Sequence, residues 1–281
     1  VMRFRSLVLT LVLTALTVVV VAGADAQKGG PATVLNGGRG VVSPDGKVRY
    51  VALTTGQHTI VSFARIPSGQ VMRWRQLRGY FGIPQVSLDG TTDGISRDGR
   101  MLVLATPAGA GTPSGNATTQ FALIDTETLR LRRVTFPGLW SYDAISPDGS
   151  ALYLIQYTEL GPSVSYRVRA YDTAARRLLA RPIVDSEIGE RLMRGWAVTR
   201  RTTSDGRWAY TLYARAKKEP FVHALDTVRR QAYCIDLPLD LKRPEQMALR
   251  LALRSDRMLE VRQGRDTVAA VDTRSLVVHR H

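Results

Sequence analysis

Ser146-Pro147-Asp148-Gly149 indicates the fold class of this protein, because this four-residue pattern returns along the chain. Proline presets φ for a turn, aspartate accepts hydrogen bonds from nearby backbone, and glycine accepts the positive φ that leads into the next strand. Complete or degenerate copies stand at four other places: Ser43-Pro44-Asp45-Gly46, Ser96-Arg97-Asp98-Gly99, Ser204-Asp205-Gly206 and Ser255-Asp256-Arg257. A recurrence with a period of roughly 50 residues predicts repeated supersecondary units.

A second pair, Asp-Thr, closes an apolar run in all but the first unit, which has Ala64-Arg65-Ile66-Pro67 instead. The copies are Asp125-Thr126, Asp172-Thr173, Asp226-Thr227 and Asp272-Thr273. Each unit therefore reads as strand, turn, strand, loop, strand, Asp-Thr turn, strand. This order predicts an all-β protein, a β-propeller of five four-stranded blades, or of six if residues 27–38 contribute one.

At these motifs the sequence resembles the secreted bacterial β-propellers built from YVTN-type and PD40 (TolB-like, WD40-like) repeats. Ala144-Ile145-Ser146-Pro147-Asp148-Gly149 with Ala151-Leu152-Tyr153-Leu154 matches the first half of that repeat, and Leu123-Ile124-Asp125-Thr126 matches the second half. The resemblance covers about residues 38–275 and implies the architecture. Its members include scaffolds, envelope-associated binding proteins and some enzymes, so it does not select one function.

The N-terminal residues read as a signal peptide rather than as part of the fold. Arg3 and Arg5 precede an apolar run, and Ala24-Asp25-Ala26 has the small-residue pattern of a cleavage site. We therefore expect residues 1–26 to be a signal peptide, 27–38 a Gly-rich lead that can supply a closing strand, and 39–281 the propeller. The mature chain would be extracellular or in the cell envelope, and it would be anchored to the membrane only if residues 1–26 stay uncleaved.

The chain is strongly basic, with a net charge of +15 and 39 lysine and arginine residues. One interpretation is attraction to an anionic partner such as a wall polymer. The other is composition, because the arginines are scattered and do not form runs. An exported protein has little access to nucleic acid, so we expect its partner to be an envelope protein or an anionic wall polymer and not nucleic acid. We also expect the protein to be a monomer.

Motifs of several enzyme classes are missing from the sequence. It has no Gly-x-Ser-x-Gly, no Walker loop and no His-Glu-x-x-His. Cys234 is the single cysteine, and the four histidines do not cluster by spacing. We therefore predict no metal centre, no cofactor and no assigned catalytic residue.

The candidate binding residues are those that differ between units at equivalent places. Loops from the last strand of one unit to the first strand of the next surround one mouth of a propeller channel, and the inner strands line its floor. The functional interpretation is a shallow pocket with an aromatic rim and charged groups at its floor. Its residues would be Tyr80, Asp93, Trp140, Tyr142, Asp143, Trp196 and Arg200. The structural alternative is that Trp140 and Trp196 wedge between blades while Asp93 and Asp143 hold adjacent loops.

Two function classes stay open at this point. The first is a non-catalytic binding or scaffold propeller of the cell envelope. The second is a channel-mouth hydrolase, such as a glycoside hydrolase or a lactonase. Glycoside hydrolysis needs two carboxyl groups about 5–10 Å apart. Asp93 and Asp143 come from adjacent units and could supply them, although no third acid or base is evident.

Overall fold

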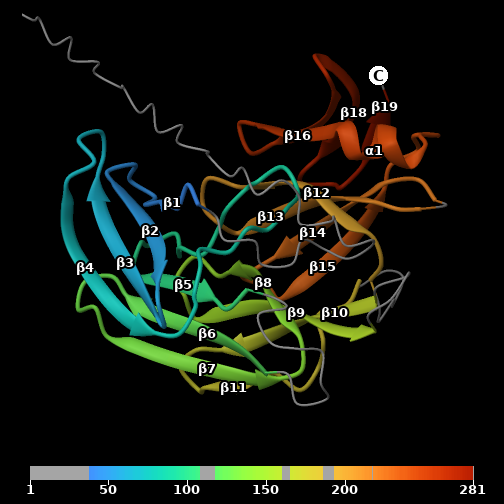
Figure 1. Cartoon of the computed structure of the whole chain (residues 1–281). Coiled ribbons are helices and arrows are strands. Elements are labelled where there is room, and N and C mark those ends of the chain that lie inside the picture. The colour runs from blue at the N-terminus through green and yellow to red at the C-terminus, as the bar shows by residue number, and fades with distance from the viewer. Residues whose placement is uncertain (1–37, 108–117, 160–164, 186–192, 217, 281) are drawn as a thin grey trace, which may run out of the picture.

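The computed structural model describes residues 38–107, 118–159, 165–185, 193–216 and 218–280. In this part of the chain the strands form five antiparallel sheets, each made of strands that follow one another in sequence (Figure 1). The predicted signal peptide and most of the predicted Gly-rich lead lie outside the described residues. No described helix is long and apolar enough to cross a membrane.

The strands of the first three sheets correspond to the first three sequence units. The first sheet contains β1 (Val41–Val42), β2 (Val48–Thr55), β3 (His58–Arg65) and β4 (Val71–Arg78). The second contains β5 (Met101–Ala105), β6 (Thr118–Asp125) and β7 (Leu131–Pro137). The third contains β8 (Trp140–Ile145), β9 (Ala151–Glu159), β10 (Ser165–Asp172) and β11 (Arg177–Leu178).

The last two sheets follow in the same order. The fourth contains β12 (Trp196–Thr202), β13 (Trp208–Ala214), β14 (Phe221–Asp226) and β15 (Gln231–Asp236). The fifth contains β16 (Leu249–Arg254), β17 (Met258–Gln263), β18 (Asp266–Asp272) and β19 (Val278–Arg280). One short helix, α1 (Arg243–Ala248), connects them.

The second sheet departs from the predicted four strands, because its inner position is held by irregular backbone. Ile95 forms a single bridge with Leu102, and the Val103 N–H donates to the Gly94 carbonyl at 2.6 Å. Gly94 has a φ of +122°, and a Cβ there would meet the Val103 carbonyl oxygen at 2.7 Å. A glycine in this conformation interrupts a regular strand.

The repeated turns are stabilised as their residue types predict. Ser146 Oγ donates to Asp148 Oδ1 at 2.7 Å, and the same carboxylate oxygen accepts from the Ser150 N–H at 3.0 Å. Gly149 has a φ of +72°. Equivalent serine–aspartate bonds are present at Ser43 with Asp45 and at Ser96 with Asp98.

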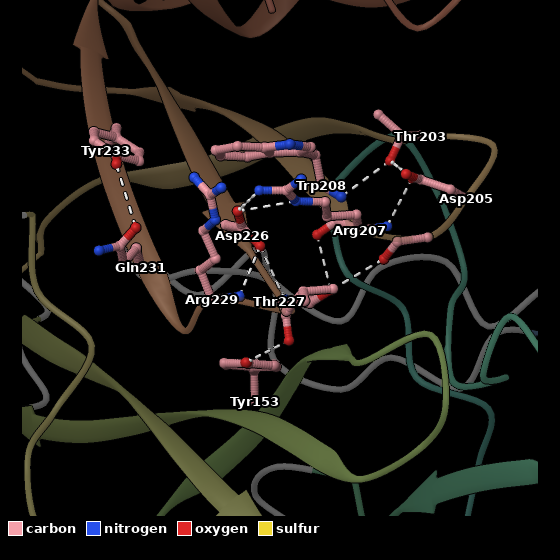
Figure 2. A network of polar contacts seen from close by, with 12 residues as sticks. Tyr153, Thr203, Asp205, Arg207, Trp208, Asp226, Thr227, Arg229, Gln231 and Tyr233 are labelled. Atoms are coloured by element: carbon pink, nitrogen blue, oxygen red, sulfur yellow. Dashed lines mark hydrogen bonds and ion pairs between the residues drawn. The ribbon is translucent and has the colours of Figure 1, made fainter. Parts of the chain in front are cut away.

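The fourth and fifth turns correct the sequence interpretation. Thr203 takes the place of the serine in the fourth turn and donates to Asp205 Oδ1 at 2.5 Å (Figure 2). The turn therefore has four residues, 203–206, and is not the shortened three-residue copy Ser204-Asp205-Gly206 that the sequence suggested. In the fifth turn Ser255 and Asp256 both have positive φ, and the Arg257 N–H donates to the Arg254 carbonyl at 3.0 Å. This is a two-residue hairpin turn of a different type. The Asp256 carboxylate instead accepts from the Ser204 hydroxyl of the fourth turn.

The threonine of each Asp-Thr pair ties the second turn of a unit to its first. Thr126 Oγ1 donates to the Gly99 carbonyl at 2.6 Å, and Thr173 Oγ1 donates to the Gly149 carbonyl at 2.7 Å. The Asp125 carboxylate accepts from the Glu127 and Thr128 backbone. Structural hydrogen bonding therefore accounts for these polar repeats.

Consecutive sheets pack face to face, with apolar residues between them. Phe63 and Leu102 belong to the core between the first and second sheets, and Phe121 and Leu152 to the core between the second and third. Further cores join the third sheet to the fourth and the fourth to the fifth. Sheets that follow one another in this way, with their inner strands together, form a β-propeller (Figure 1).

The first and fifth sheets share no apolar core in the described part of the chain. The strand register places Val42, Leu53 and Trp74 on the face of the first sheet that points away from the second, and all three are exposed. On the fifth sheet, Arg254 and Arg262 both pair with Glu260. The blade count of the closed ring therefore stays a prediction.

Candidate functional site

A small hairpin, residues 85–92, occupies the channel mouth that the sequence marked as the binding site. The Val86 N–H donates to the Thr91 carbonyl at 2.8 Å, and Ser87 Oγ donates to Asp89 Oδ1 at 2.7 Å. The Leu88 N–H donates to the Ala197 carbonyl at 2.9 Å. A loop between the first and second sheets therefore reaches the inner strand β12 of the fourth sheet and crosses the channel.

This hairpin was missed by sequence reasoning, although the sequence held a signal for it. Ser87-Leu88-Asp89-Gly90 is a further copy of the Ser-x-Asp-Gly turn, with the same serine-to-aspartate bond as the others. It stands only nine residues before the turn at 96–99, so it does not fit the period of about 50 residues that identifies the other turns. Its two strands pair through the bridge between Gln85 and Thr92.

The predicted aromatic rim is not assembled. Trp140 is only 3% exposed, its Nε1 donates to the Pro137 carbonyl at 2.8 Å, and it packs in the core between the second and third sheets. Trp196 is half-buried beside the core of the fourth and fifth sheets, with the Arg243 guanidinium 4.0 Å from its ring centroid. Tyr80 is 50% exposed. The two tryptophans are placed as the wedge alternative describes.

The predicted charged residues, by contrast, come together at the centre of the molecule. Arg200 of β12 forms an ion pair with Asp143 of β8, and both side chains are almost fully buried. The Arg200 guanidinium also donates to the Asp143 carbonyl, and its Nε donates to Thr211 Oγ1 at 2.8 Å. Burial alone would lower the pKa of Arg200, but the negative charge of Asp143 raises it above its ordinary value.

The backbone explains how Asp143 reaches this position. The pairing of β8 with β9 shifts register between Tyr142 and Ala144, which leaves Asp143 as the extra residue of a β-bulge. β12 has a similar shift between Ala197 and Thr199. A bulge re-aims a side chain relative to the regular alternation of a strand. The ion pair therefore joins the inner strands of the third and fourth sheets.

Asp93 lies beside this pair without an ion-pair partner of its own among the described residues. Its Oδ1 accepts from the Gly94 N–H at 2.7 Å. Burial raises the pKa of Asp93 above its ordinary value, although the charge of Arg200 and hydrogen bonds from Gly94 and Tyr142 oppose that rise. Burial likewise raises the pKa of the Tyr142 phenol, and the Asp93 charge adds to the effect.

A cavity of about 290 Å³ opens at the end of the channel where the repeated turns lie. Four of the five sheets contribute to its walls: Val42 and Pro44 from the first, Asp93, Ile95 and Arg97 from the second, Ala144 and Ile145 from the third, and Thr202, Thr203, Ser204, Gly206, Ala209 and Thr227 from the fourth and its turns. Of the predicted site residues, Asp93 belongs to the lining of this cavity and the other six do not. The cavity faces the end of the channel opposite the predicted aromatic rim.

Most hydroxyl groups around this cavity are already bonded within the protein. Thr203 donates to Asp205, and Thr227 Oγ1 donates to the Arg207 carbonyl at 2.8 Å (Figure 2). The Ser204 hydroxyl donates to Asp256. Tyr153 of the third sheet also donates to the Thr227 carbonyl at 2.7 Å, which joins the third sheet to the fourth. No group of three or more potential metal ligands is found among the described residues.

In sequence comparisons no family model and no curated protein matches the chain. Among solved structures, the chain is similar to TolB from Acinetobacter baumannii, with 14% identity and a TM-score of 0.47, over 84% of this chain and 52% of that protein. It is also similar to putative TolB from Agrobacterium tumefaciens, with 15% identity and a TM-score of 0.44, over 88% of this chain and 79% of that one. The Kuenenia stuttgartiensis hydrazine synthase has 14% identity and a TM-score of 0.48, over 92% of this chain and 69% of that one.

The chain thus spans about half the length of the Acinetobacter protein. A likeness this low in identity and TM-score does not establish membership in a family, and it does not transfer a function. The assignment to the β-propellers follows from the chain's own sheets, which are antiparallel, sequential and packed face to face.

Proposed function

We propose that this chain is an exported β-propeller that binds a partner in the cell envelope and does not catalyse a reaction. Residues 1–26 would direct export, 27–38 would lead into the fold, and the propeller would act as a monomer. Its partner would be an envelope protein or an anionic wall polymer rather than nucleic acid. The cavity at the turn end of the channel carries the proposal, since a concave site with a few polar groups is the usual form of a binding pocket.

The alternative, a channel-mouth hydrolase, has less support from the geometry. A glycoside hydrolase needs two carboxyl groups that both reach the substrate. Asp143 is 1% exposed and is bound by Arg200 through both its side chain and its carbonyl. Only Asp93 of the two lines the cavity. A single accessible carboxyl group fits a binding role better than that reaction.

Site-specific photo-crosslinking tests this function. A photoreactive residue at Arg97, which is exposed and lines the cavity, should crosslink a partner in intact cells that export the full chain. The matched control is Gln57, which is exposed in the turn between β2 and β3 of the first sheet. A discrete crosslinked species from position 97 and none from position 57 supports the proposal. The same species from both positions, or none from either, contradicts it.

A further inference from the structure

We propose that the cavity beside Asp93 binds the ammonium group of an alkylamine, with the Asp93 carboxylate as its counter-ion. This inference rests on the proposed function, because it names the chemistry of the group that the same cavity accepts. Three observations carry it: the carboxylate without an ion-pair partner, the commitment of the neighbouring cations, and the apolar side chains in part of the remaining wall.

No described lysine, arginine or histidine forms an ion pair with the Asp93 carboxylate. The Gly94 N–H and the Tyr142 phenol donate hydrogen bonds to it and the nearby Arg200 charge favours its ionised form, but the ion pair of Arg200 is with Asp143. With Asp143 and Arg200 beside Asp93, the central cluster holds two carboxyl groups and one guanidinium. An ionised carboxylate in a partly desolvated place is stabilised by a cation, so the cluster lacks one positive charge.

The nearby arginines are occupied elsewhere. Arg200 directs its Nε to Thr211 and its terminal nitrogens to Asp143. Arg97 lines the cavity, its side chain is exposed, and it donates to the Pro44 carbonyl at 3.3 Å. Neither guanidinium therefore takes the place of the missing cation, and the position next to Asp93 is left to a ligand.

Part of the remaining wall is apolar and can contact a hydrocarbon chain. Val42, Ile95 and Ile145 line the cavity, and the Thr203, Ser204 and Thr227 hydroxyls already donate to acceptors of the protein. A volume of about 290 Å³ is small for a ligand pocket. Such a site suits a short alkyl chain that ends in one cationic head, because methylene groups meet the apolar wall and the ammonium meets Asp93.

Because the net charge of the chain is +15, attraction by the overall charge and attraction by the Asp93 carboxylate favour ligands of opposite sign. A basic protein attracts anions at long range, so a ligand chosen by overall charge alone would be an anion. An amine would have to be selected by the local carboxylate. The two possibilities predict opposite preferences between an amine and a carboxylic acid of equal chain length.

Ligand-observed NMR titration of residues 27–281 tests the inference with three matched probes: n-pentylammonium, 1-pentanol and pentanoate. We expect n-pentylammonium to bind most tightly. Asp93→Asn should weaken its binding by about ten- to a hundredfold, the range for a hydrogen bond to a charged group. Asp240→Asn, which removes an exposed carboxylate outside the cavity lining, should leave the binding unchanged. Circular dichroism melting would show that both variants fold.

A second variant keeps the test decisive if Asp93→Asn does not fold. Val42→Phe enlarges a partly exposed cavity-lining side chain and should block n-pentylammonium as well. Equal binding of 1-pentanol, tighter binding of pentanoate, or undiminished binding by Asp93→Asn or Val42→Phe would overturn the inference. A crosslink from position 97 together with no amine binding would refute the ligand class alone and leave the proposed function standing.

Discussion

Asp143 and Arg200 form a buried ion pair that joins the inner strands of two neighbouring sheets. Removing one partner of such a pair leaves an uncompensated charge in the interior. Arg200→Met should therefore lower the free energy of unfolding by about 3–5 kcal/mol. The double variant Asp143→Asn with Arg200→Met should recover much of that loss, because no unpaired charge is left. Urea unfolding of the four proteins in this double-mutant cycle measures both effects, and equal losses in the single and double variants would contradict the expectation.

Asp93→Asn should raise the melting temperature at neutral pH. The pKa of Asp93 is raised above its ordinary value of 3.8, so the folded protein binds this proton more tightly than the unfolded chain. The resulting stabilisation is complete below the unfolded pKa and is lost as the pH rises through the folded pKa. Asparagine keeps an oxygen for the Gly94 N–H and carries no charge. Calorimetry from pH 3 to 7 should show a gain that shrinks toward low pH, whereas a lower melting temperature at pH 7 would mean that the carboxylate is well compensated.

The turn aspartates should give the opposite pH dependence. Hydrogen bonds from the Ala175 and Ala174 backbone lower the pKa of Asp172 below 3.8, although burial opposes them, and the backbone N–H groups of Ser275 and Arg274 do the same for Asp272. Their stabilisation is present above the unfolded pKa and is lost as the pH falls through the lower folded values. Asp172→Asn should therefore flatten the fall of stability below about pH 4. Asp240→Asn serves as the control, and an equal effect there would point to general charge repulsion.

Replacing the aspartate of a regular turn should cost more than replacing its counterpart in the fifth turn. Asp148 accepts from Ser146 Oγ and from the Ser150 N–H, so Asp148→Ala should lose about 1 kcal/mol of unfolding free energy. Asp256 instead lies in a two-residue turn with positive φ, and its carboxylate bonds the exposed Ser204. Asp256→Ala should have the smaller effect in thermal unfolding. The reverse order would show that the contact of Asp256 with Ser204, between the fifth and fourth turns, stabilises the protein more than the hydrogen bonds of Asp148 within its own turn.

We predict that residues 27–36 close the ring between the first and fifth sheets. Among the described residues β19 pairs with β18 on one side only, and Val277 beside it is 52% exposed. We expect the apolar stretch Ala32–Leu35 to pair with the outer strand of the fifth unit, near Leu276–Val278. Deleting residues 27–36 should lower the melting temperature by several degrees and speed proteolysis of the C-terminus. Deleting residues 27–30 alone keeps the apolar stretch and should have little effect; equal melting of both deletions and the mature chain would make this segment a linker.

Much of the fold could be predicted because local chemistry determines it. The Ser-x-Asp-Gly and Asp-Thr turns stabilise themselves through bonds within a few residues, so their spacing locates the strands. β2 begins at Val48, just after the first Ser-Pro-Asp-Gly turn, as the predicted order of turn and strand requires. The irregular inner strand of the second sheet was not predicted, because Gly94 alone gives little warning of a φ near +122°.

The candidate site could be predicted only in part, for a physical reason. Equivalent inner-strand positions must converge on the axis of a propeller, and this rule correctly grouped Asp143 with Arg200. Trp140 packs in the core between the second and third sheets, a choice that depends on tertiary packing and not on the repeat period. The hairpin at 85–92 depends likewise on a distant partner, because β12 is more than a hundred residues away in sequence.

The order of the strands also sets a sequence of events for a chain that emerges from its N-terminus. Each sheet is built from neighbouring strands, so its ladder can close as soon as its own residues are available, and such local pairing is fast. The hydrogen bonds from Leu88 and Asp89 to β12 cannot form until the fourth sheet has arrived. Until then the hairpin has no strand to dock on. We therefore expect residues 85–92 to take their final position late in folding, after the first three sheets and the inner strand of the fourth.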